Sequence, residues 1–399
     1  MAESEPRASA DDRAKNGERL DGAELVALIK RVFPPLGGEK GLAILVDLPD
    51  ALVGDNPDWA RRRQMAAEWL AELHGAAAQL GLRPVLALFR NAHNNNGELP
   101  KACWLHAGGA LPACAEALDP ARAIPFSELY AAHSLLLAPT EFSATAPLKM
   151  AARTYGFRAA TMGGFCAGMI PALRLDYHEV SRRVAWLKGR LDAASGADFH
   201  FAYPGGEARL HLDLRFRSAH ASGGLLPHAG SAGNLPSGEA YIVPYEGERA
   251  GEASRSAGEL PVQFGDEVVR YRIENNSAVK VLSTGPASRA EAEHLVREPA
   301  YGNVAELGLG VLALFGVKPV GEILLDEKLG LHIAFGRSDH FGGSVGPANF
   351  SRPDAVIHID RVYVPETQPA VVVKSVDLLG GDGTRFALMR DGEYVVDFR

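Results

Sequence analysis

The segment 41–89 restricts the possible folds of this chain more than any other part of the sequence. Residues 41–47 form an apolar run that ends in an aspartate, which is typical of a strand buried on both faces of a parallel sheet. Residues 57–80 carry apolar side chains along one helical stripe, and Gly81 follows as a stop signal. Residues 84–89 form a second apolar run. Strand, helix and strand in this order predict a right-handed parallel crossover.

The same alternation continues through the first half of the sequence. The open, doubly wound α/β domain that it predicts covers residues 21–196 and follows a disordered tail at residues 1–20. No GxGxxG dinucleotide signature follows the first strand, and the glycine cluster Gly163–Gly168 lacks the lysine of a P-loop, so a tight turn is the favoured interpretation. The other elements expected here are strands at 134–138 and 157–162 and helices at 23–33, from Pro147 and at 176–194.

The sequence pattern changes near Ser195–Ala197. Beyond this point short alternating segments are separated by glycine and proline, and one clear helix is predicted at 288–297. Residues 197–399 are therefore predicted to form a mostly antiparallel β domain that carries a metal site. Its expected strands are 199–203, 208–216, 239–244, 259–264, 267–274 and 278–283.

Composition narrows the classes of function. The 399 residues are 47% apolar and 23% charged, as in ordinary globular proteins, and no apolar run is long enough to span a membrane. The net charge of −8, with basic residues spread along the chain, favours a small molecule or peptide as partner over nucleic acid or a membrane. Three cysteines without a CxxC pair predict neither a disulfide scaffold nor a structural zinc site, and a cytoplasmic location is expected.

Candidate metal ligands interrupt several apolar strands of the second half. His358 and Asp360 lie two residues apart in the segment 356–364, so a β-strand points both to one face. His332 and Glu306 each interrupt an apolar run, and Glu239 stands where a loop meets a strand. Burying such groups costs about 2–7 kcal/mol each unless they are paired or bound to a metal. Three such interruptions in one region favour a common cause.

Each of these residues also has an ordinary explanation. Glu239 fits a solvated strand edge, His332 fits a core histidine bonded to a backbone carbonyl, and Glu306 fits a loop acid. Their combination favours metal binding over these ordinary explanations, because two glutamates, two histidines and one aspartate are suitable donors for Zn, Co, Mn or Fe. We therefore predict a metal site.

The sequence here resembles the thermophilic-type metallo-aminopeptidase family, and in particular its leucyl-aminopeptidase-like branch. The resemblance covers roughly residues 134–365 and rests on the phrases NLPSGEAYIVP, NVAELGLG, GEILLDEKLGLHIAFG and HIDRVYV in family order. It implies a homodimer and two adjacent divalent ions, Zn, Co or Mn. The ligands that it implies are Glu239, Glu306, His332, His358 and Asp360.

Two such ions lower the pKa of a water molecule toward ~7 and polarise a scissile carbonyl group. The resemblance thus implies a metallo-hydrolase of the aminopeptidase type, a protease that cleaves amide or peptide bonds. One carboxylate must orient the water or receive its proton, and both Glu306 and Glu239 are candidates.

Three further candidates follow His332 in the loop 336–343. Asp339 and His340 are candidate catalytic residues that can shuttle protons or add a metal ligand. Asp339 can also bind a substrate amine, and Arg337 a substrate carboxylate. An ordinary surface ion pair between Arg337 and Asp339 explains these two residues equally well. Asp339 also occupies the position at which the aminopeptidases have a functional tyrosine, which puts classical peptidase activity in question.

Two other functions compete with hydrolysis. The iron-dependent 2,5-dihydroxypyridine dioxygenase resembles the same scaffold, but it has a histidine where this chain has Glu306 and lacks a counterpart of His332. A mononuclear Fe(II) ring-cleaving dioxygenase is thus the first alternative. A catalytically divergent protein that binds a metal or a small molecule is the second. The two-metal type of ligand set favours hydrolysis.

Overall fold

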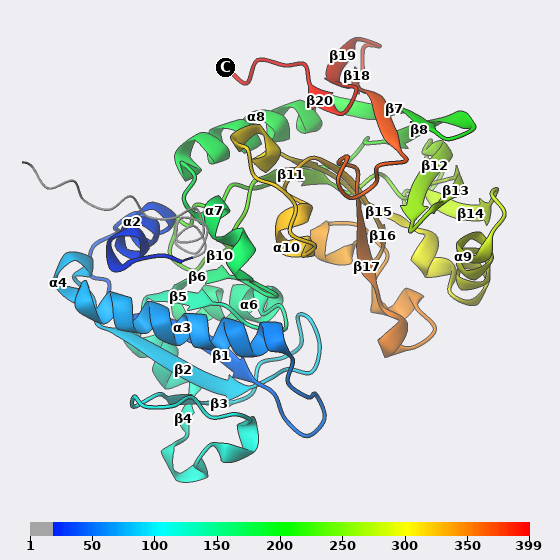
Figure 1. Cartoon of the computed structure of the whole chain (residues 1–399). Helices are drawn as coiled ribbons and strands as arrows, with labels where there is room; N and C mark the ends of the chain where they lie inside the picture. The colour runs from blue at the N-terminus through cyan, green and yellow to red at the C-terminus, as the bar shows by residue number, and fades with distance from the viewer. Residues whose placement is uncertain (1–18) are drawn as a thin grey trace, which may run out of the picture. The chain divides into compact units, whose positions relative to one another are not determined.

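The structure is a computed structural model that describes residues 19–399 (Figure 1). The predicted tail therefore lies almost wholly outside the described residues. The chain forms two compact units, the first made of the described residues up to His178 together with Gly224–Ser237, and the second of Glu179–Gly223 and Gly238–Arg399. This grouping assigns most of the helix α8 (Tyr177–Ala193) to the second unit. The domain limit proposed from the sequence at residue 196 stays a prediction.

The first unit is built on a seven-stranded, mostly parallel sheet with the strand order β10-β6-β5-β1-β2-β3-β4. The five strands from β10 to β2 run parallel, and β3 and β4 are antiparallel to their neighbours. The expected α/β class is confirmed. The strands are β1 (Leu42–Leu48), β2 (Pro84–Arg90), β3 (Ala102–Leu105), β4 (Ile124–Pro125), β5 (Leu135–Ala138), β6 (Arg158–Thr161) and β10 (Ala232–Asn234).

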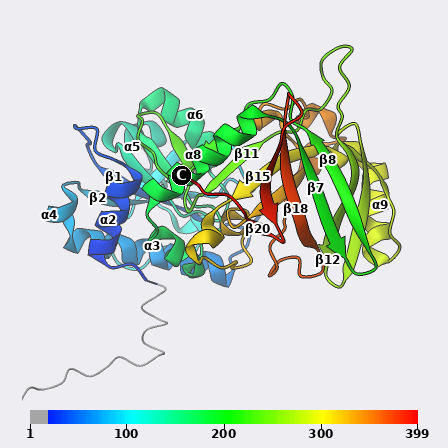
Figure 2. The same ribbon diagram turned by 90° about the horizontal axis from the view of Figure 1, so that it is seen from above.

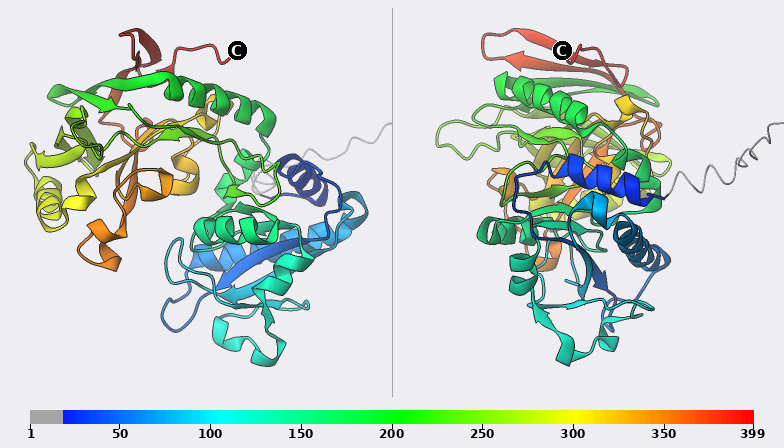
Figure 3. Two further views of the ribbon diagram at one scale, coloured as in Figure 1. Left: turned by 180° about the vertical axis from the view of Figure 1, so that it is seen from behind. Right: turned by 90° about the vertical axis from the view of Figure 1, so that its left-hand side faces the viewer.

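Helices cover both faces of this sheet (Figures 1 and 3). Ala43 and Leu45 of β1 join a core cluster with α5 (Phe126–Ala132) and α6 (Thr145–Tyr155), whereas α3 (Pro57–Gly75) packs on β1 and β2. The chain crosses from β1 to β2 in one direction along the sheet and from β5 to β6 in the opposite direction. Right-handed crossovers in opposite directions place their helices on opposite faces of a sheet. The sheet is therefore doubly wound.

Local signals fix the ends of the first helices. Helix α2 (Gly22–Val32) begins with a capping box between Asp21 and Glu24, and Asn56 caps α3 through the backbone N–H of Trp59. The helix expected over 57–80 is divided, because α3 ends at Gly75 and a short α4 (Ala77–Leu80) follows. Gly81 ends α4 with a φ of 72°, a left-handed value that glycine adopts without strain. A short α7 (Ile170–Leu173) also belongs to this unit.

The second unit contains two antiparallel sheets. The larger has eight strands in the order β14-β13-β12-β8-β7-β18-β19-β20, and Figure 2 shows β12, β8, β7 and β18 from above. The smaller has five strands in the order β17-β16-β15-β11-β9. The predicted mainly β class is confirmed. The eight-stranded sheet contains β7 (Ala194–Tyr203), β8 (Gly206–Asp213), β12 (Ala257–Phe264), β13 (Glu267–Glu274), β14 (Ser277–Val281), β18 (Val372–Gly380), β19 (Arg385–Arg390) and β20 (Glu393–Tyr394).

The five-stranded sheet has one apolar face that packs on the larger sheet. Phe335 contacts Tyr271 of β13 with ring centroids 5.1 Å apart, and the hydroxyl of Tyr363 donates to the Pro261 carbonyl of β12 over 2.9 Å. Because strand residues alternate, the opposite face is free to carry polar side chains. The strands of this sheet are β9 (His220–Ser222), β11 (Glu239–Ile242), β15 (Val304–Gly310), β16 (Leu331–Gly336) and β17 (His358–Val362).

Two further helices of the second unit are α9 (Pro286–Arg297) and the short α10 (Ile323–Asp326). Helix α9 coincides closely with the helix expected at 288–297. Among the described residues, no helix has both the length and the apolar character needed to cross a membrane.

Candidate metal centre

The register of the five-stranded sheet places the five predicted ligands on one face. Directly opposite residues of antiparallel strands point to the same side, so the pairing can be followed from strand to strand. From β17 to β11 the opposed pairs are His358 with Gly336, Asp360 with Ala334, Ala334 with Glu306, His332 with Gly308, and Glu239 with Gly310. In Figure 1 the strands β11, β15, β16 and β17 lie next to one another in this order.

The side chains form two groups that share Glu306. Glu239, Glu306 and His332 make the first group, and Glu306, His358 and Asp360 make the second. In the first group, His332 Nε2 lies 3.3 Å from Glu306 Oε1 and 3.5 Å from Glu239 Oε2. In the second, His358 Nε2 lies 3.4 Å from Glu306 Oε2 and 3.5 Å from Asp360 Oδ1. Glu306 therefore presents one carboxylate oxygen to each group.

These distances match those between ligands of one metal ion. Donor atoms placed about 2.0–2.1 Å from a tetrahedral ion lie about 3.3–3.4 Å from one another. The donors here are imidazole nitrogens and carboxylate oxygens, which Zn and its first-row neighbours accept. The chemistry and spacing of both groups thus fit a divalent cation.

A hydrogen bond fixes the tautomer of His358. Its Nδ1 lies 2.8 Å from the Arg337 carbonyl oxygen, which can only accept, so Nδ1 carries the hydrogen. In the neutral ring the lone pair is therefore on Nε2, the atom nearest to Glu306 and Asp360. Metal-binding histidines commonly have this arrangement, in which a backbone carbonyl orients the ring from behind.

The ring of His332 fits into a space that only a glycine leaves open. A Cβ atom at position 308 would overlap the ring, at 2.6 Å from Cδ2 and closer to Nε2. His332 is fully buried. Its Nδ1 atom and the Oε2 atom of Glu239 are buried without a hydrogen-bond partner. Unpaired buried polar atoms are costly, and a cation beside Glu239 Oε2 would remove that cost for the carboxylate.

The electrostatics of the cluster favour a cation. Burial alone would lower the pKa of His332, but the hydrogen bond to Glu306 and the charge of Glu239 raise it to about 9. His358 behaves in the same way, because Asp360 and Glu306 outweigh burial and raise its pKa well above the usual value. The carboxylates thus attract positive charge to both rings. A divalent cation can supply that charge in place of the protons.

Two charged residues that sequence analysis did not single out adjoin the first group. The Lys328 ammonium is fully buried and lies 2.6 Å from Glu239 Oε1, and it also pairs with Glu327. Burial alone would lower the pKa of Lys328, but the two carboxylates raise it above the usual value. Burial raises the pKa of Glu327 to about 8. The signal in the sequence was a Glu–Lys pair inside the apolar stretch before β16.

The loop after β16 holds the remaining predicted site residues. Arg337 Nε donates to Asp339 Oδ1 over 2.5 Å, and both side chains are about one-third exposed. His340 lies beside the cluster, with its ring centroid 5.3 Å from that of His358. Burial and the charge of His358 lower the pKa of His340 to about 4. The structure thus brings His340 close to a candidate ligand, and pairs Arg337 with Asp339.

A buried carboxylate anchors this loop. Glu246 accepts hydrogen bonds from Ser338 and from the Ser344 hydroxyl, the latter over 2.7 Å. Asn303 Nδ2 donates to Glu246 over 2.8 Å and to the Gly336 carbonyl over 2.9 Å. Arg217 lies 3.3 Å from the same carboxylate. Glu246 therefore ties the loop that carries Arg337, Asp339 and His340 to the strands around it.

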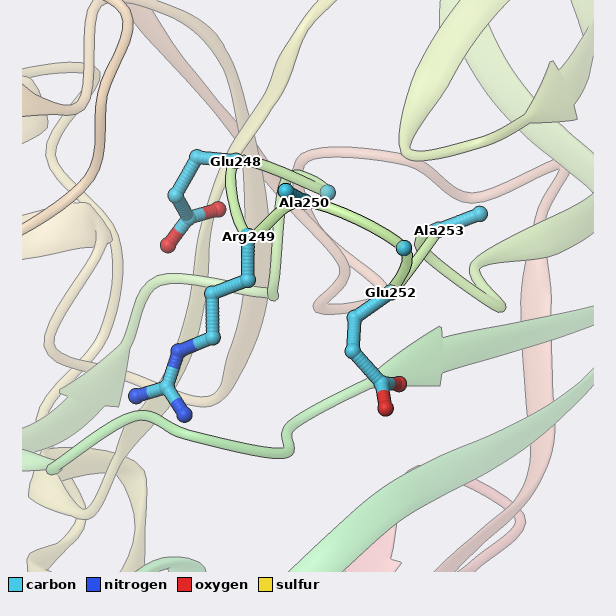
Figure 4. Close-up of a pocket in the computed structure, with 7 residues that line it drawn as sticks. Glu248, Arg249, Ala250, Glu252 and Ala253 are labelled. Atoms are coloured by element: carbon cyan, nitrogen blue, oxygen red, sulfur yellow. The ribbon is translucent and has the colours of Figure 1, made fainter.

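Two surface hollows of the second unit contain no member of the cluster. One is lined by Ala292, Glu293, Val296 and Arg297 of α9, and the other by the loop Gly247–Ala253 (Figure 4). The charges of this loop are already used, because Glu252 pairs with Arg215 over 3.0 Å and Arg249 lies over the Phe216 ring. The cluster on the five-stranded sheet is therefore the better candidate for a functional site.

Comparison with known proteins supports the fold and leaves the reaction open. No protein-family model matches the sequence, and no curated protein matches it. The structure is similar to that of 2,5-dihydroxypyridine dioxygenase from Pseudomonas putida KT2440, with a TM-score of 0.58 and 14% identity over 95% of this chain and 99% of that chain. It is also similar to the aminopeptidase AmpT from Thermus thermophilus, with a TM-score of 0.53 and 18% identity over 96% of this chain and 100% of that chain. The fold is shared with both.

These comparisons confirm the structural resemblance expected from the sequence. Both similar proteins are enzymes, one an aminopeptidase and the other a dioxygenase. At such identities the likeness concerns the fold alone. The roles assigned to the site residues stay predictions, and the choice between reactions must come from the side chains.

Proposed function

We propose that this protein is a metal-dependent hydrolase that cleaves an amide or peptide bond at the Glu306 cluster. The observation that carries the proposal is the pair of three-ligand groups that share Glu306. Two divalent ions bound there, Zn, Co or Mn, would activate water and polarise the carbonyl group of a substrate. A mononuclear centre needs no second group of this kind.

Each ligand has a defined task in this proposal. Glu306 sets the spacing of the two groups, because its two oxygens face His332 and His358 separately. Glu239 completes the first group and Asp360 the second. Glu306 and Glu239 are the carboxylates proposed to orient the attacking water or receive its proton, as expected from the sequence.

The loop residues act on the substrate and on protons. The lowered pKa of His340 keeps its ring neutral at pH 7, and a neutral imidazole can relay a proton by accepting it at one ring nitrogen while it donates from the other, beside His358. Arg337 is proposed to bind a substrate carboxylate, and Asp339 a substrate amine or a proton. Their mutual ion pair holds both groups in place when no substrate is bound.

Elemental analysis of the full-length protein, together with hydrolysis of aminoacyl-p-nitroanilides and dipeptides, tests the proposal. We expect up to two ions per chain, and we expect His358→Ala and Asp360→Ala to lose turnover and at least one ion. Matched controls are His200→Ala, in the other sheet, and Asp354→Ala, an exposed residue with 72% side-chain exposure. Full metal content and full activity in the His358 and Asp360 variants would refute the proposal.

A dioxygenase is the second candidate function. The two histidines lie in different groups, but both contact Glu306, and two histidines with one carboxylate are the donor types of many non-haem Fe(II) oxygenases. One structurally similar protein is a dioxygenase. Loading with Fe(II) under anaerobic conditions, followed by oxygen-uptake measurements with hydroxypyridines and catechols, distinguishes the two reactions. Oxygen uptake coupled to ring cleavage, without peptide hydrolysis, would favour the dioxygenase.

A further inference from the structure

The buried ammonium of Lys328 distinguishes the two ligand groups. In the first group, the cationic neighbour of Glu239 Oε1 is the Lys328 ammonium, whose Nζ lies 2.6 Å away. In the second group, the neighbour of Asp360 is the His358 ring at 3.5 Å. Lys328 is fully buried, and lysine is almost never found in this state unless it is paired. Its charge is therefore committed to the neighbouring carboxylates.

The backbone holds Lys328 firmly in this position. The Lys328 N–H donates to the Leu325 carbonyl over 2.9 Å, and its own carbonyl accepts from the Leu312 N–H over 2.9 Å. The backbone of Lys328 also lies so close to Gly310 of β15 that any Cβ at that position would collide with it. The ammonium is thus placed by the fold, on a segment that cannot move away from β15.

We propose that Lys328 makes the two cation positions unequal, because it neutralises Glu239 and so weakens binding at Glu239–Glu306–His332 relative to Glu306–His358–Asp360. Lys328 occupies Glu239 Oε1 and leaves only Oε2 directed at His332, whereas the charge of Lys328 acts on Asp360 of the second group only from a distance, without a direct contact. A positive charge beside a ligand repels a divalent ion and lowers its affinity. This inference rests on the proposed two-metal function.

The consequence is stepwise loading. The first divalent ion binds at Glu306–His358–Asp360, and the second, exchangeable ion binds beside Lys328. Glu327 moderates the effect, because it also accepts from the Lys328 ammonium and so shares that group with Glu239. Removing Lys328 and removing Glu327 should therefore change the affinity of the weaker position in opposite directions. A purely structural role for the pair would weaken binding in both variants.

Titration of the metal-free full-length protein with Zn²⁺, in competition with a chromophoric chelator, tests the inference without an activity assay. We expect two affinity classes at least about tenfold apart in the wild type. Glu239→Gln should lose the weaker class and Asp360→Asn the tighter one. Lys328→Gln should tighten the weaker class about tenfold, and Glu327→Gln should weaken it.

The double variant E327Q/K328Q replaces both members of the buried pair by neutral amides, so it serves as the second test if Lys328→Gln does not fold. It should bind the second ion more tightly than Glu327→Gln does. Two equal classes in the wild type would overturn the inference while leaving the proposed function intact. So would a shift in the same direction in Lys328→Gln and Glu327→Gln. If the wild type binds one ion and Lys328→Gln binds two, the inference is supported. If both proteins bind one ion, it is overturned. The absence of all binding refutes the proposed function and the inference together.

Discussion

Gly308→Ala is the substitution that most directly probes how the sheet builds the cluster. Gly308 stands opposite His332 in the β15–β16 pair, and the imidazole fills the space where a side chain would otherwise be. The new methyl group would lie 2.6 Å from Cδ2 of His332 and closer still to Nε2, whereas real Cβ atoms keep at least 3.0 Å from other heavy atoms. The ring must therefore retreat by roughly 1 Å, because the packed interior offers little room to absorb the overlap.

Such a displacement acts selectively on one ligand group. His332 Nε2 would lose its present distances of 3.3 Å and 3.5 Å to Glu306 and Glu239, whereas His358 and Asp360 lie on other strands and need not move. A misplacement of about 1 Å in a reactive constellation costs on the order of 100-fold in activity. Overpacking of the core adds about 1–3 kcal/mol of destabilisation.

The assay is elemental analysis after dialysis, followed by peptide hydrolysis. We expect Gly308→Ala to keep the ion of the Glu306–His358–Asp360 group, to lose the other ion and to retain at most about 1% of the activity. Gly381→Ala is the matched control, because a Cβ at position 381 would meet no atom within 4 Å and the φ of this residue is not positive. A Gly308→Ala protein with two ions and full activity would show that the His332 ring does not need the space that Gly308 leaves open.

Three further predictions follow from other parts of the structure. Glu246→Ala should lower kcat/KM at least about tenfold while both ions remain bound, since it frees the loop of Arg337 and His340, and Glu248→Ala is its control. Treatment with a chelator should lower the free energy of unfolding by about 3 kcal/mol relative to protein with metal at 100-fold above its Kd, as measured by urea titration. Burial raises the pKa of Asp47 to about 6, so the native state holds a proton that the unfolded state loses near 3.8. The contribution of Asp47 to stability should therefore fall by up to about 3 kcal/mol as pH rises from 4 to 7, and the difference in free energy of unfolding between wild type and Asp47→Asn should change in this direction between pH 4 and 7 in urea titrations.

The strands that the sequence predicted well are those whose side-chain pattern is set locally. The apolar runs at 41–47 and 84–89 became β1 and β2, because a central parallel strand is buried on both faces and needs an unbroken apolar sequence. Short edge strands were missed, among them β9 and β10. Strand β10 has three residues and joins the first sheet beside β6, although it lies more than 70 residues later in the chain. No local pattern encodes such a partner.

The clustering of the five candidate ligands was predictable for a related reason. A charged or imidazole side chain within an apolar strand is costly, so each interruption in the sequence already required a partner. The same reasoning applied to Lys328 would have found the ammonium, but its partner Glu239 lies 89 residues away. Only the register of β11, β15 and β16 shows that the two are in contact. The ammonium beside the cluster was thus harder to predict than the members of the cluster.

The proposed function offers a reason why proteins with this fold differ in their reactions. The strands fix the backbone positions of the ligands, whereas the identity of each side chain sets the number of cations that can be held. In the proposed function the deciding residue is Glu306, because its carboxylate presents one oxygen to each group, whereas a histidine at the same position would present one nitrogen toward them. Glu306→His should therefore convert two-ion binding into one-ion binding. A Glu306→His protein that still binds two Zn²⁺ ions would remove the main reason for preferring hydrolysis.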